Sequence, residues 1–182
     1  NYNSTAEVVV NQGGTSSGKT YSILQVLCLK AIAEPDQVIS VVGQDVPNLK
    51  SGALRDMQTI VASSPDIQSW IKGYNASDRI YSFQNGSLIE FKSYQDSQDA
   101  KSGKRDYFFL NEANGISYEI YSELAMRTKK QVYIDYNPNA RFWVHDKLIG
   151  NEGVELIISD HRHNPFLPDV IRKKIEAIRK DD

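Results

Sequence analysis

Short β-branched or aromatic runs alternate along this chain with longer segments whose apolar residues recur at helical spacing. The short runs predict buried strands, and the longer segments predict amphipathic helices. Strands are expected at residues 6–10, 37–43, 80–83, 88–91, 107–110, 131–136 and 154–158. Helices are expected at residues 21–32, 45–63, 117–127, 142–149 and 168–180. The alternation predicts an α/β fold in which a mainly parallel sheet has helices on both faces.

Turn-forming residues separate these elements. Pro35 and Pro65 end the first two helices, because the residue before a proline is disfavoured in helical conformation. Asn85-Gly86 lies between two β-rich runs, which is a strong hairpin signal. We therefore expect an antiparallel hairpin attached to the edge of the main sheet. Residues 95–104 are polar throughout and predict a mobile loop.

Composition narrows the class of protein. With 182 residues, 40% hydrophobic and 24% charged, the chain is expected to form one globular domain over residues 1–182. Its single cysteine, Cys28, excludes an intrachain disulfide, and no run of residues predicts a membrane span or a signal peptide. The net charge of −2 means that any contact with nucleic acid must use local basic patches. The first residue, Asn1, is not Met, which predicts a fragment of a longer protein.

Residues 13–20 spell G-G-T-S-S-G-K-T, which fits the phosphate-binding loop G-x-x-x-x-G-K-[ST]. The loop follows a predicted strand and precedes a predicted helix, whose positive end and N–H groups would face the phosphates. Lys19 would reach the β- and γ-phosphates, and the hydroxyl of Thr20 would bind Mg²⁺. The alternative is a plain Gly/Ser-rich surface loop, which the flanking strand and helix disfavour. The expected nucleotide-binding residues are Gly13, Gly14, Thr15, Ser16, Ser17, Gly18, Lys19, Thr20 and Tyr21.

Hydrolysis also needs a group that positions the attacking water and a second group that binds the metal. Asn111-Glu112 directly follows a predicted buried strand, at the sheet edge where ligands bind in α/β proteins. We expect Glu112 to be the water-activating carboxylate. The amide oxygen of Asn111 would support Mg²⁺ through a bound water, without a negative charge. The alternative is that both residues merely cap the following helix.

Asn137 follows the next predicted strand and is expected at the same edge of the sheet. Its amide could hydrogen-bond the γ-phosphate or the attacking water, and so report the state of the nucleotide. A plain Asn-Pro turn explains the same residues nearly as well. No N-K-x-D string for guanine recognition is present, so ATP is the expected nucleotide.

These motifs together resemble the ATPase domain of tailed-phage large terminase subunits. The resemblance depends on residues 13–20, 107–114 (Y-F-F-L-N-E-A-N), 134–139 (I-D-Y-N-P-N), 142–145 (F-W-V-H) and 164–167 (N-P-F-L). It implies a P-loop NTPase of the additional-strand, conserved-glutamate type that pumps double-stranded DNA into a procapsid. It also implies that Lys19 and Thr20 bind phosphate and Mg²⁺, that Glu112 is catalytic, and that Asn137 couples hydrolysis to movement.

The resemblance further implies partners and a location. These are double-stranded DNA, a portal protein and a small terminase subunit, with a homo-oligomeric ring assembled on the procapsid in the cytoplasm of the infected bacterial host, and no membrane. Family members continue into a nuclease domain, for which this chain has no room after residue 182. The chain is therefore expected to be the motor domain alone.

Two positions depart from the family pattern. Asn111 replaces the usual Asp before the glutamate, and Thr15 stands where many members have an arginine in the phosphate loop. An arginine finger, which stabilises charge on the γ-phosphoryl group, must then come from elsewhere. Arg105 and Arg127 are the candidates, either within one site or in a neighbouring subunit of a ring. The alternative is that both are surface residues paired with nearby acids.

Two other functions share part of these motifs. One is another P-loop motor, such as a helicase-like or secretion ATPase. The other is a nucleotide-binding assembly switch without turnover, for which the uncharged Asn111 would be the sign. ATP hydrolysis in Mg²⁺ separates the switch from the motors, and capsid-dependent DNA packaging separates the two motors.

Overall fold

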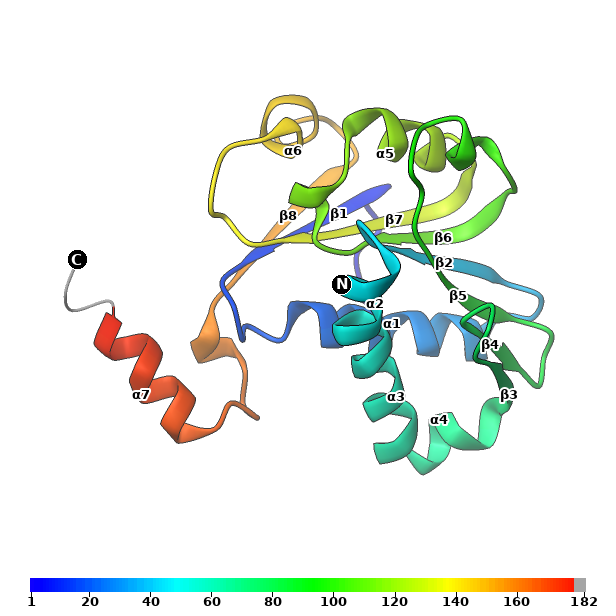
Figure 1. The fold of residues 1–182 in the computed structure, drawn as a ribbon, viewed down its shortest axis with the longest axis horizontal. Coiled ribbons are helices and arrows are strands. Elements are labelled where there is room, and N and C mark those ends of the chain that lie inside the picture. The colour runs from blue at the N-terminus through cyan, green and yellow to red at the C-terminus, as the bar shows by residue number, and fades with distance from the viewer. Residues whose placement is uncertain (179–182) are drawn as a thin grey trace.

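Eight strands form one mixed sheet in the computed structural model, which describes residues 1–178 (Figure 1). Their order across the sheet is β3-β4-β5-β2-β6-β7-β1-β8. In chain order the strands are β1 (Val8–Gly13), β2 (Val38–Val42), β3 (Ile71–Asn75), β4 (Ile80–Phe83), β5 (Leu88–Lys92), β6 (Arg105–Leu110), β7 (Thr128–Tyr136) and β8 (Val154–Ser159).

The strands from β5 to β8 in this order all run parallel, so their carboxyl ends lie at one edge of the sheet. Strand β7 lies between β1 and β6, so one additional strand separates the strand before the phosphate loop from the strand before Asn111-Glu112. All six residues of β6 are buried, as expected for a central strand covered on both faces. The parallel arrangement places every motif of the sequence at the same edge.

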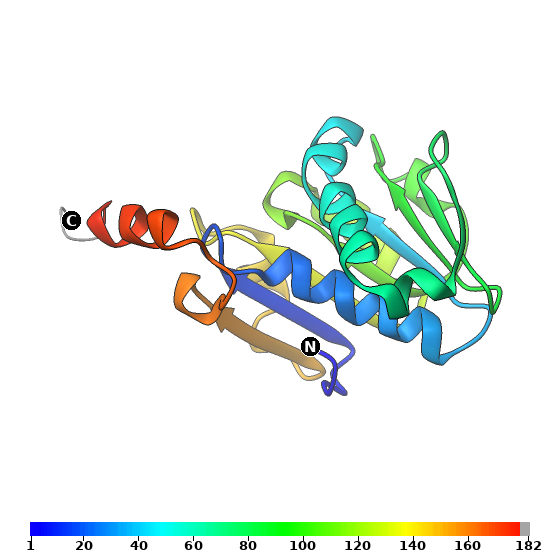
Figure 2. The ribbon, with the colours of Figure 1, turned by 90° about the horizontal axis from the view of Figure 1, so that it is seen from below.

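Helices cover both faces of the sheet, which confirms the predicted fold class (Figures 1 and 2). One face carries α1 and α3, and the other carries α5 and α6; α7 extends away from the sheet. The helices are α1 (Lys19–Ala33), α2 (Val46–Ser51), α3 (Ala53–Ser63), α4 (Pro65–Trp70), α5 (Tyr118–Ala125), α6 (Trp143–Lys147) and α7 (Asp169–Ile178). Short 3₁₀ turns are η1 (Asp99–Lys101), η2 (Ala113–Gly115) and η3 (His161–His163). Among the described helices, none has the length and apolar character needed to cross a membrane.

Each face of the sheet has its own hydrophobic core. On the α1 face, alternate residues of the central strands, such as Val41, Phe109 and Tyr133, pack against α1 and α3. On the α5 face, the intervening residues, such as Phe108 and Ile134, pack against α5 and α6. Because side chains alternate along a strand, successive apolar residues of a central strand belong to opposite cores.

The predicted hairpin is confirmed, with Gly86 in the left-handed region at φ 87°. Strand β5 also pairs in parallel with β2, which joins the hairpin to the main sheet. The side chain of Asn85 donates hydrogen bonds to the carbonyls of Ala31, Ile32 and Glu34 at the end of α1. The hairpin turn thus also caps the helix that follows the phosphate loop.

Three expectations need correction. The single helix over residues 45–63 is wrong, because Gly52 adopts a non-helical conformation (φ −113°, ψ −104°) and divides it into α2 and α3. The short helix α4 and the strand β3 were not expected from the sequence. The mostly polar and exposed residues of β3 give no apolar alternation, and the strand is positioned by pairing with β4.

The other predicted elements are confirmed within a few residues of their expected ends. The terminal helix predicted over residues 168–180 is present as α7, and its last two predicted residues lie outside the described part of the chain. Residues 95–104 are irregular apart from η1, where Ala100 is buried. Their mobility stays a prediction.

The Asn85 cap provides a test of how the hairpin supports α1. We expect Asn85→Ala to lower the free energy of unfolding by about 1–2 kcal/mol, because the helix carbonyls lose their donor. Asn85→Asp should be at least as harmful, since it puts a negative charge at the negative end of the helix. Urea unfolding measures both, with Asn3→Ala at an exposed position as the control. An unfolding free energy equal to that of the Asn3 control would contradict the capping role.

Candidate nucleotide-binding site

The phosphate loop joins the end of β1 to the start of α1. Gly13 is tightly enclosed, because a Cβ atom there would lie 2.7 Å from the carbonyl oxygen of Ser159. Gly18 precedes α1 with φ 78°, a conformation that glycine adopts without strain. Ser16 also has a positive φ of 67°. These left-handed residues give the loop a conformation of the kind that turns backbone N–H groups inward.

Asn164, which follows β8, supports the loop from outside. Its side-chain amide donates a hydrogen bond of 3.0 Å to the carbonyl of Ser16, and its Cγ would lie 3.6 Å from a Cβ at Gly18. From the sequence, residues 164–167 were only part of the family resemblance, without a role. The structure places Asn164 against the phosphate loop as a supporting residue.

Lys19 is the first residue of α1 and points back over the loop. Its Nζ donates hydrogen bonds to Oδ1 of Asn137 at 2.6 Å and to the carbonyl of Gly14 at 3.4 Å. Burial lowers the pKa of Lys19, and the nearby charges of Asp135 and Glu112 oppose that shift. The structure thus brings Lys19 and Asn137 together, from motifs far apart in the sequence.

Asp135 lies at the centre of the site, fully buried near the end of β7. Its carboxylate accepts hydrogen bonds from the hydroxyl of Thr20, from Nδ2 of Asn111 at 3.1 Å and from the backbone N–H of Glu112 at 2.7 Å. Burial raises the pKa of Asp135, while these hydrogen bonds and the charge of Lys19 act in the opposite direction.

Sequence reasoning assigned no role to Asp135, although a usable signal was present. Asn137 was expected at the site, and a residue two positions earlier on a strand faces the same side. Tyr133 packs in the core on the α1 face, so Asp135 faces the first turn of α1, where Thr20 lies. The signal was an acidic residue in a largely apolar predicted strand, two positions before a residue already expected at the site.

Glu112 is exposed at the carboxyl edge of the sheet, next to the buried Asn111. Its backbone lies in the left-handed region (φ 55°, ψ 57°), which costs a residue with a side chain about 1–2 kcal/mol. The hydrogen bond from its N–H to Asp135 holds this conformation. The capping alternative is wrong for α5, because Ser117 is the residue whose side chain caps that helix.

Asn137 forms the turn that was the alternative explanation, and it also contacts Lys19. The backbone carbonyl of Asn137 accepts a hydrogen bond of 2.8 Å from the N–H of Asn139, while the side chain binds Lys19. The aromatic ring of the preceding residue, Tyr136, packs edge-on against Phe142 at 4.9 Å between centroids. Residues at the end of β7 are thus linked to the start of α6.

The structure separates both candidate arginines from the site. Arg105 begins β6, so it lies about 20 Å along the strand from Asn111. Its buried guanidinium donates to Ser40, Ser102 and Leu124, which leaves it no role as a finger in its own site or a neighbour's. Arg127 precedes β7 at the same far edge and pairs with Glu123 at 2.6 Å.

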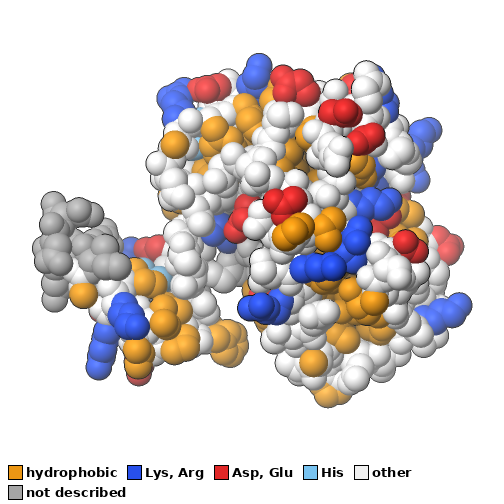
Figure 3. All heavy atoms as spheres, viewed as in Figure 1, with side chains coloured by type: hydrophobic (Ala, Val, Ile, Leu, Met, Phe, Trp, Pro, Cys, Tyr) orange, Lys and Arg blue, Asp and Glu red, His pale blue; other side chains and the backbone are white. Residues whose placement is uncertain are grey.

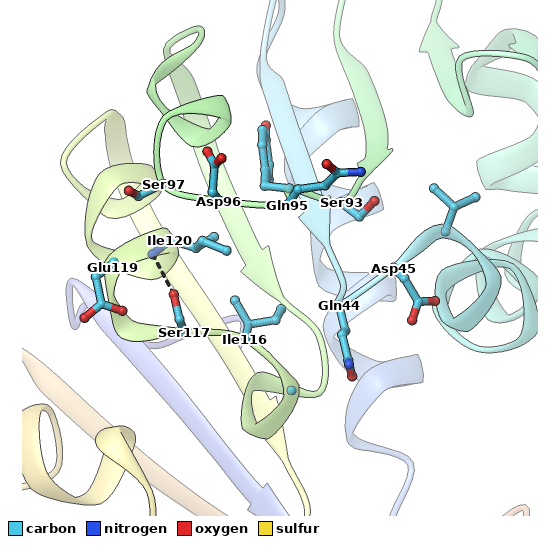
Figure 4. A pocket seen from close by; sticks show the side chains of 13 residues that line it. Gln44, Asp45, Ser93, Gln95, Asp96, Ser97, Ile116, Ser117, Glu119 and Ile120 are labelled. Carbon is cyan, nitrogen blue, oxygen red and sulfur yellow. Dashed lines mark hydrogen bonds between the residues drawn. The ribbon is translucent and has the colours of Figure 1, made fainter.

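Two other features are the side chain of Tyr21 and a cavity whose lining contains none of residues 13–20. Tyr21 packs against the core on the α1 face. A cavity of about 830 Å³ opens beyond the ends of β2, β5 and β6 (Figure 4). Its lining includes Asp45, Asp96 and Glu119, so its charge does not suit phosphate. The oxygen and nitrogen groups that fit a nucleotide and a hard cation are those around Lys19, Thr20 and Asp135.

Comparisons with known proteins agree with this arrangement. A family model described as phage terminase large subunit matches residues 5–182. A comparison with curated protein sequences gives no significant match.

Three solved structures share the fold. The large terminase from a thermophilic bacteriophage matches with a TM-score of 0.78 and 14% identity, over 94% of this chain and 45% of that chain. The same bacteriophage's large terminase in complex with ATP-gamma-S matches with a TM-score of 0.76 and 11% identity, over 94% and 44%. The large terminase ATPase domain of Thermus phage P74-26 matches with a TM-score of 0.66 and 14% identity, over 93% and 86%. The chain thus spans less than half the length of the first of these proteins, the thermophilic bacteriophage terminase.

The two adjacent glycines at the start of the loop provide a matched test. Gly13→Ala should destabilise the protein by about 1–3 kcal/mol and weaken nucleotide binding, because the new methyl group would meet backbone at 2.7 Å. Gly14→Ala should have a much smaller effect on stability, because a Cβ there would meet nothing within 4 Å. Thermal unfolding and binding of a fluorescent ATP analogue measure both. Equal losses in the two variants would contradict the described packing of the loop.

Proposed function

Because this chain belongs to the phage terminase large subunit family, we propose that it binds and hydrolyses ATP to drive double-stranded DNA into a viral procapsid. The observation that carries the proposal is the meeting of Lys19, Thr20, Asp135 and Glu112 at the carboxyl edge of the sheet. The chain covers 86% of the P74-26 ATPase domain, which supports treating residues 1–182 as one ATPase unit.

ATP is the proposed nucleotide. The backbone of residues 13–18, together with the amino end of α1, would hold the phosphates, and Lys19 would neutralise charge on the β- and γ-phosphates. The thermophilic bacteriophage terminase, which has the same fold, has been solved in complex with ADP and with ATP-gamma-S, and this supports the choice.

Mg²⁺ is the proposed metal. The oxygen atoms beside the loop are the Thr20 hydroxyl and the Asp135 carboxylate, and oxygen donors of these types are the ones Mg²⁺ prefers, so the residues fit the ion. When bound, Mg²⁺ would neutralise the negative charge that develops on the phosphate oxygens during hydrolysis. Thr20 would hold the ion directly.

Glu112 is the proposed general base. It is exposed just beyond the end of β6, and its charge acts on Lys19 of the phosphate loop. There it would accept a proton from the water that attacks the γ-phosphate. General-base catalysis of this type contributes about 10²–10⁴-fold in rate.

Asn137 is the proposed sensor of the nucleotide. A γ-phosphate that draws the Lys19 ammonium towards itself would break the 2.6 Å contact with Asn137. The freed amide and the end of β7 could then shift, and the contact between Tyr136 and Phe142 would pass the movement to α6. This sequence of contacts is the proposed route from hydrolysis to movement.

DNA, a portal protein and a small terminase subunit are the proposed partners, in a ring of copies of this chain on a procapsid inside the infected cell. Figure 3 shows acidic and basic side chains interspersed on one face, without a field of one sign. DNA contact would therefore use local basic groups, and ring formation would place many weak contacts along one duplex.

A pair of substitutions tests the active-site assignment. Lys19→Ala should abolish ATP binding or hydrolysis, because the phosphates lose their main side-chain partner. Glu112→Gln should still bind ATP but turn over about a hundredfold slower or worse. Steady-state ATP hydrolysis in Mg²⁺ and binding of an ATP analogue measure both, with Glu119→Gln, on α5, as the control.

The same measurements separate the rival functions. If the wild-type protein binds ATP but shows no turnover, the chain is a nucleotide-dependent switch. If Glu112→Gln hydrolyses ATP at the normal rate, the general base lies elsewhere. Packaging of DNA into procapsids by the full-length protein, abolished by Glu112→Gln, distinguishes the genome-packaging motor from other P-loop motors.

A finger supplied by a neighbouring subunit is proposed for Arg127, whose side chain is partly exposed. We expect ATP turnover per molecule to rise with protein concentration. Mixing Glu112→Gln with Arg127→Ala should restore some turnover, because a mixed interface can join an intact glutamate to an intact arginine. Lys129→Ala, at an exposed position nearby, is the control. Turnover that is independent of concentration, with no rescue on mixing, would rule out this finger.

A further inference from the structure

We propose that Asp135, on β7, provides the metal-side carboxylate of this site, and that Asn111, on β6, positions it. The inference deepens the proposed ATPase function and rests on it. P-loop ATPases need the phosphate-loop hydroxyl and a second, acidic hold on Mg²⁺ from a strand end. In this chain the position before the glutamate carries an amide, and the acid lies at the end of the neighbouring strand.

The register of the sheet makes this arrangement possible. Leu110 pairs with Ile134, so the next residues, Asn111 and Asp135, lie side by side at the ends of β6 and β7. Both side chains are buried at this point, and they are joined by hydrogen bonds of 3.1 and 3.3 Å. A carboxylate on either strand would therefore occupy nearly the same region of the site.

Asp135 has the contact that a metal-side group requires. One of its oxygens accepts the hydroxyl proton of Thr20, the residue that the phosphate-loop motif assigns to Mg²⁺. A Mg²⁺ ion on Thr20 is thus within reach of the Asp135 carboxylate, either directly or through one water of its hydration shell. The other oxygen accepts the N–H of Glu112, which ties the metal side of the site to the proposed base.

Asn111 has a different role in this proposal from the one expected from the sequence. Its Nδ2 points at both oxygens of Asp135, so the amide acts as a donor to the carboxylate. An acid at position 111 would instead place two carboxylates about 3 Å apart, and like charges at that distance disfavour ionisation of both. Asn111 is therefore a positioning residue, whose hydrogen bonds fix the orientation of the Asp135 carboxylate.

The competing explanation is that Asp135 only ties α1 to the ends of β6 and β7. Three variants separate the two explanations: Asp135→Asn, Asn111→Asp and the double exchange Asn111→Asp/Asp135→Asn. The control is Asp106→Asn, at the far end of β6, where a buried acid accepts a hydrogen bond from the N–H of Val38 at 2.9 Å. The measurements are thermal unfolding without nucleotide and the Mg²⁺ concentration at the midpoint of fluorescent ATP-analogue binding.

We expect Asp135→Asn to raise the Mg²⁺ midpoint about tenfold or more, while binding in EDTA is unchanged. The double exchange should return the midpoint to within about threefold of the wild-type value, because it restores one carboxylate and one amide donor. Asn111→Asp alone should lower the unfolding temperature. Asp106→Asn should lower the unfolding temperature too, without a change in the Mg²⁺ midpoint.

The outcomes distinguish the inference from the function on which it rests. A wild-type protein that binds no ATP analogue in Mg²⁺ overturns the proposed function. A wild-type protein that binds it, with an unchanged midpoint in Asp135→Asn, overturns this inference alone. If Asp135→Asn does not fold, the double exchange decides: a midpoint near the wild-type value supports the inference, and a midpoint raised about tenfold or more overturns it.

Discussion

The carboxylate of Asp135 is the group on which the site most depends. Burying a charge is unfavourable unless hydrogen bonds replace the lost water, and three donors from two parts of the chain do so here. These donors belong to the first turn of α1, the end of β6 and the backbone of Glu112. Each of the three is therefore held in place by the same buried acid. Loss of that acid would free the helix start and the strained glutamate together.

The parallel sheet explains why a few contacts are enough to bring the residues of the site together. Strands β1, β6, β7 and β8 all end at one edge, so the phosphate loop, Glu112, Asn137 and Asn164 meet without long connecting segments. The two cores hold the strands from opposite faces, and β6 is buried along its whole length. The site can therefore place a left-handed glutamate at the end of a rigid strand, where its strain is offset by the packing below.

Much of this arrangement could be predicted from the sequence. Periodicity and turn residues identified most of the strands, and the glycine-rich motif located the phosphate loop, because both depend on local chemistry. The break at Gly52 and the strand β3 depend on tertiary packing, which local patterns do not contain. Arg105 illustrates the same limit, since its position in the sequence did not show that the sheet separates it from the site. The phase of Asp135 with Asn137 could have indicated that it faces the site, but its contacts with Asn111 and Glu112 depend on the register between β6 and β7, which is a property of the folded sheet.

The contact between Asn164 and the phosphate loop has a mechanical consequence. Only residues 165–168 separate Asn164 from the start of α7, which gives a connection of at most about 17 Å when extended. That connection is already folded, because Asn164 accepts hydrogen bonds from the N–H groups of Phe166 and Leu167, and Leu167 is buried. If α7 is pulled further than this short connection can extend, either the turn must unfold or Asn164 must move away from the carbonyl of Ser16. Tension on the protruding helix is thus transmitted to the loop that would hold the phosphates.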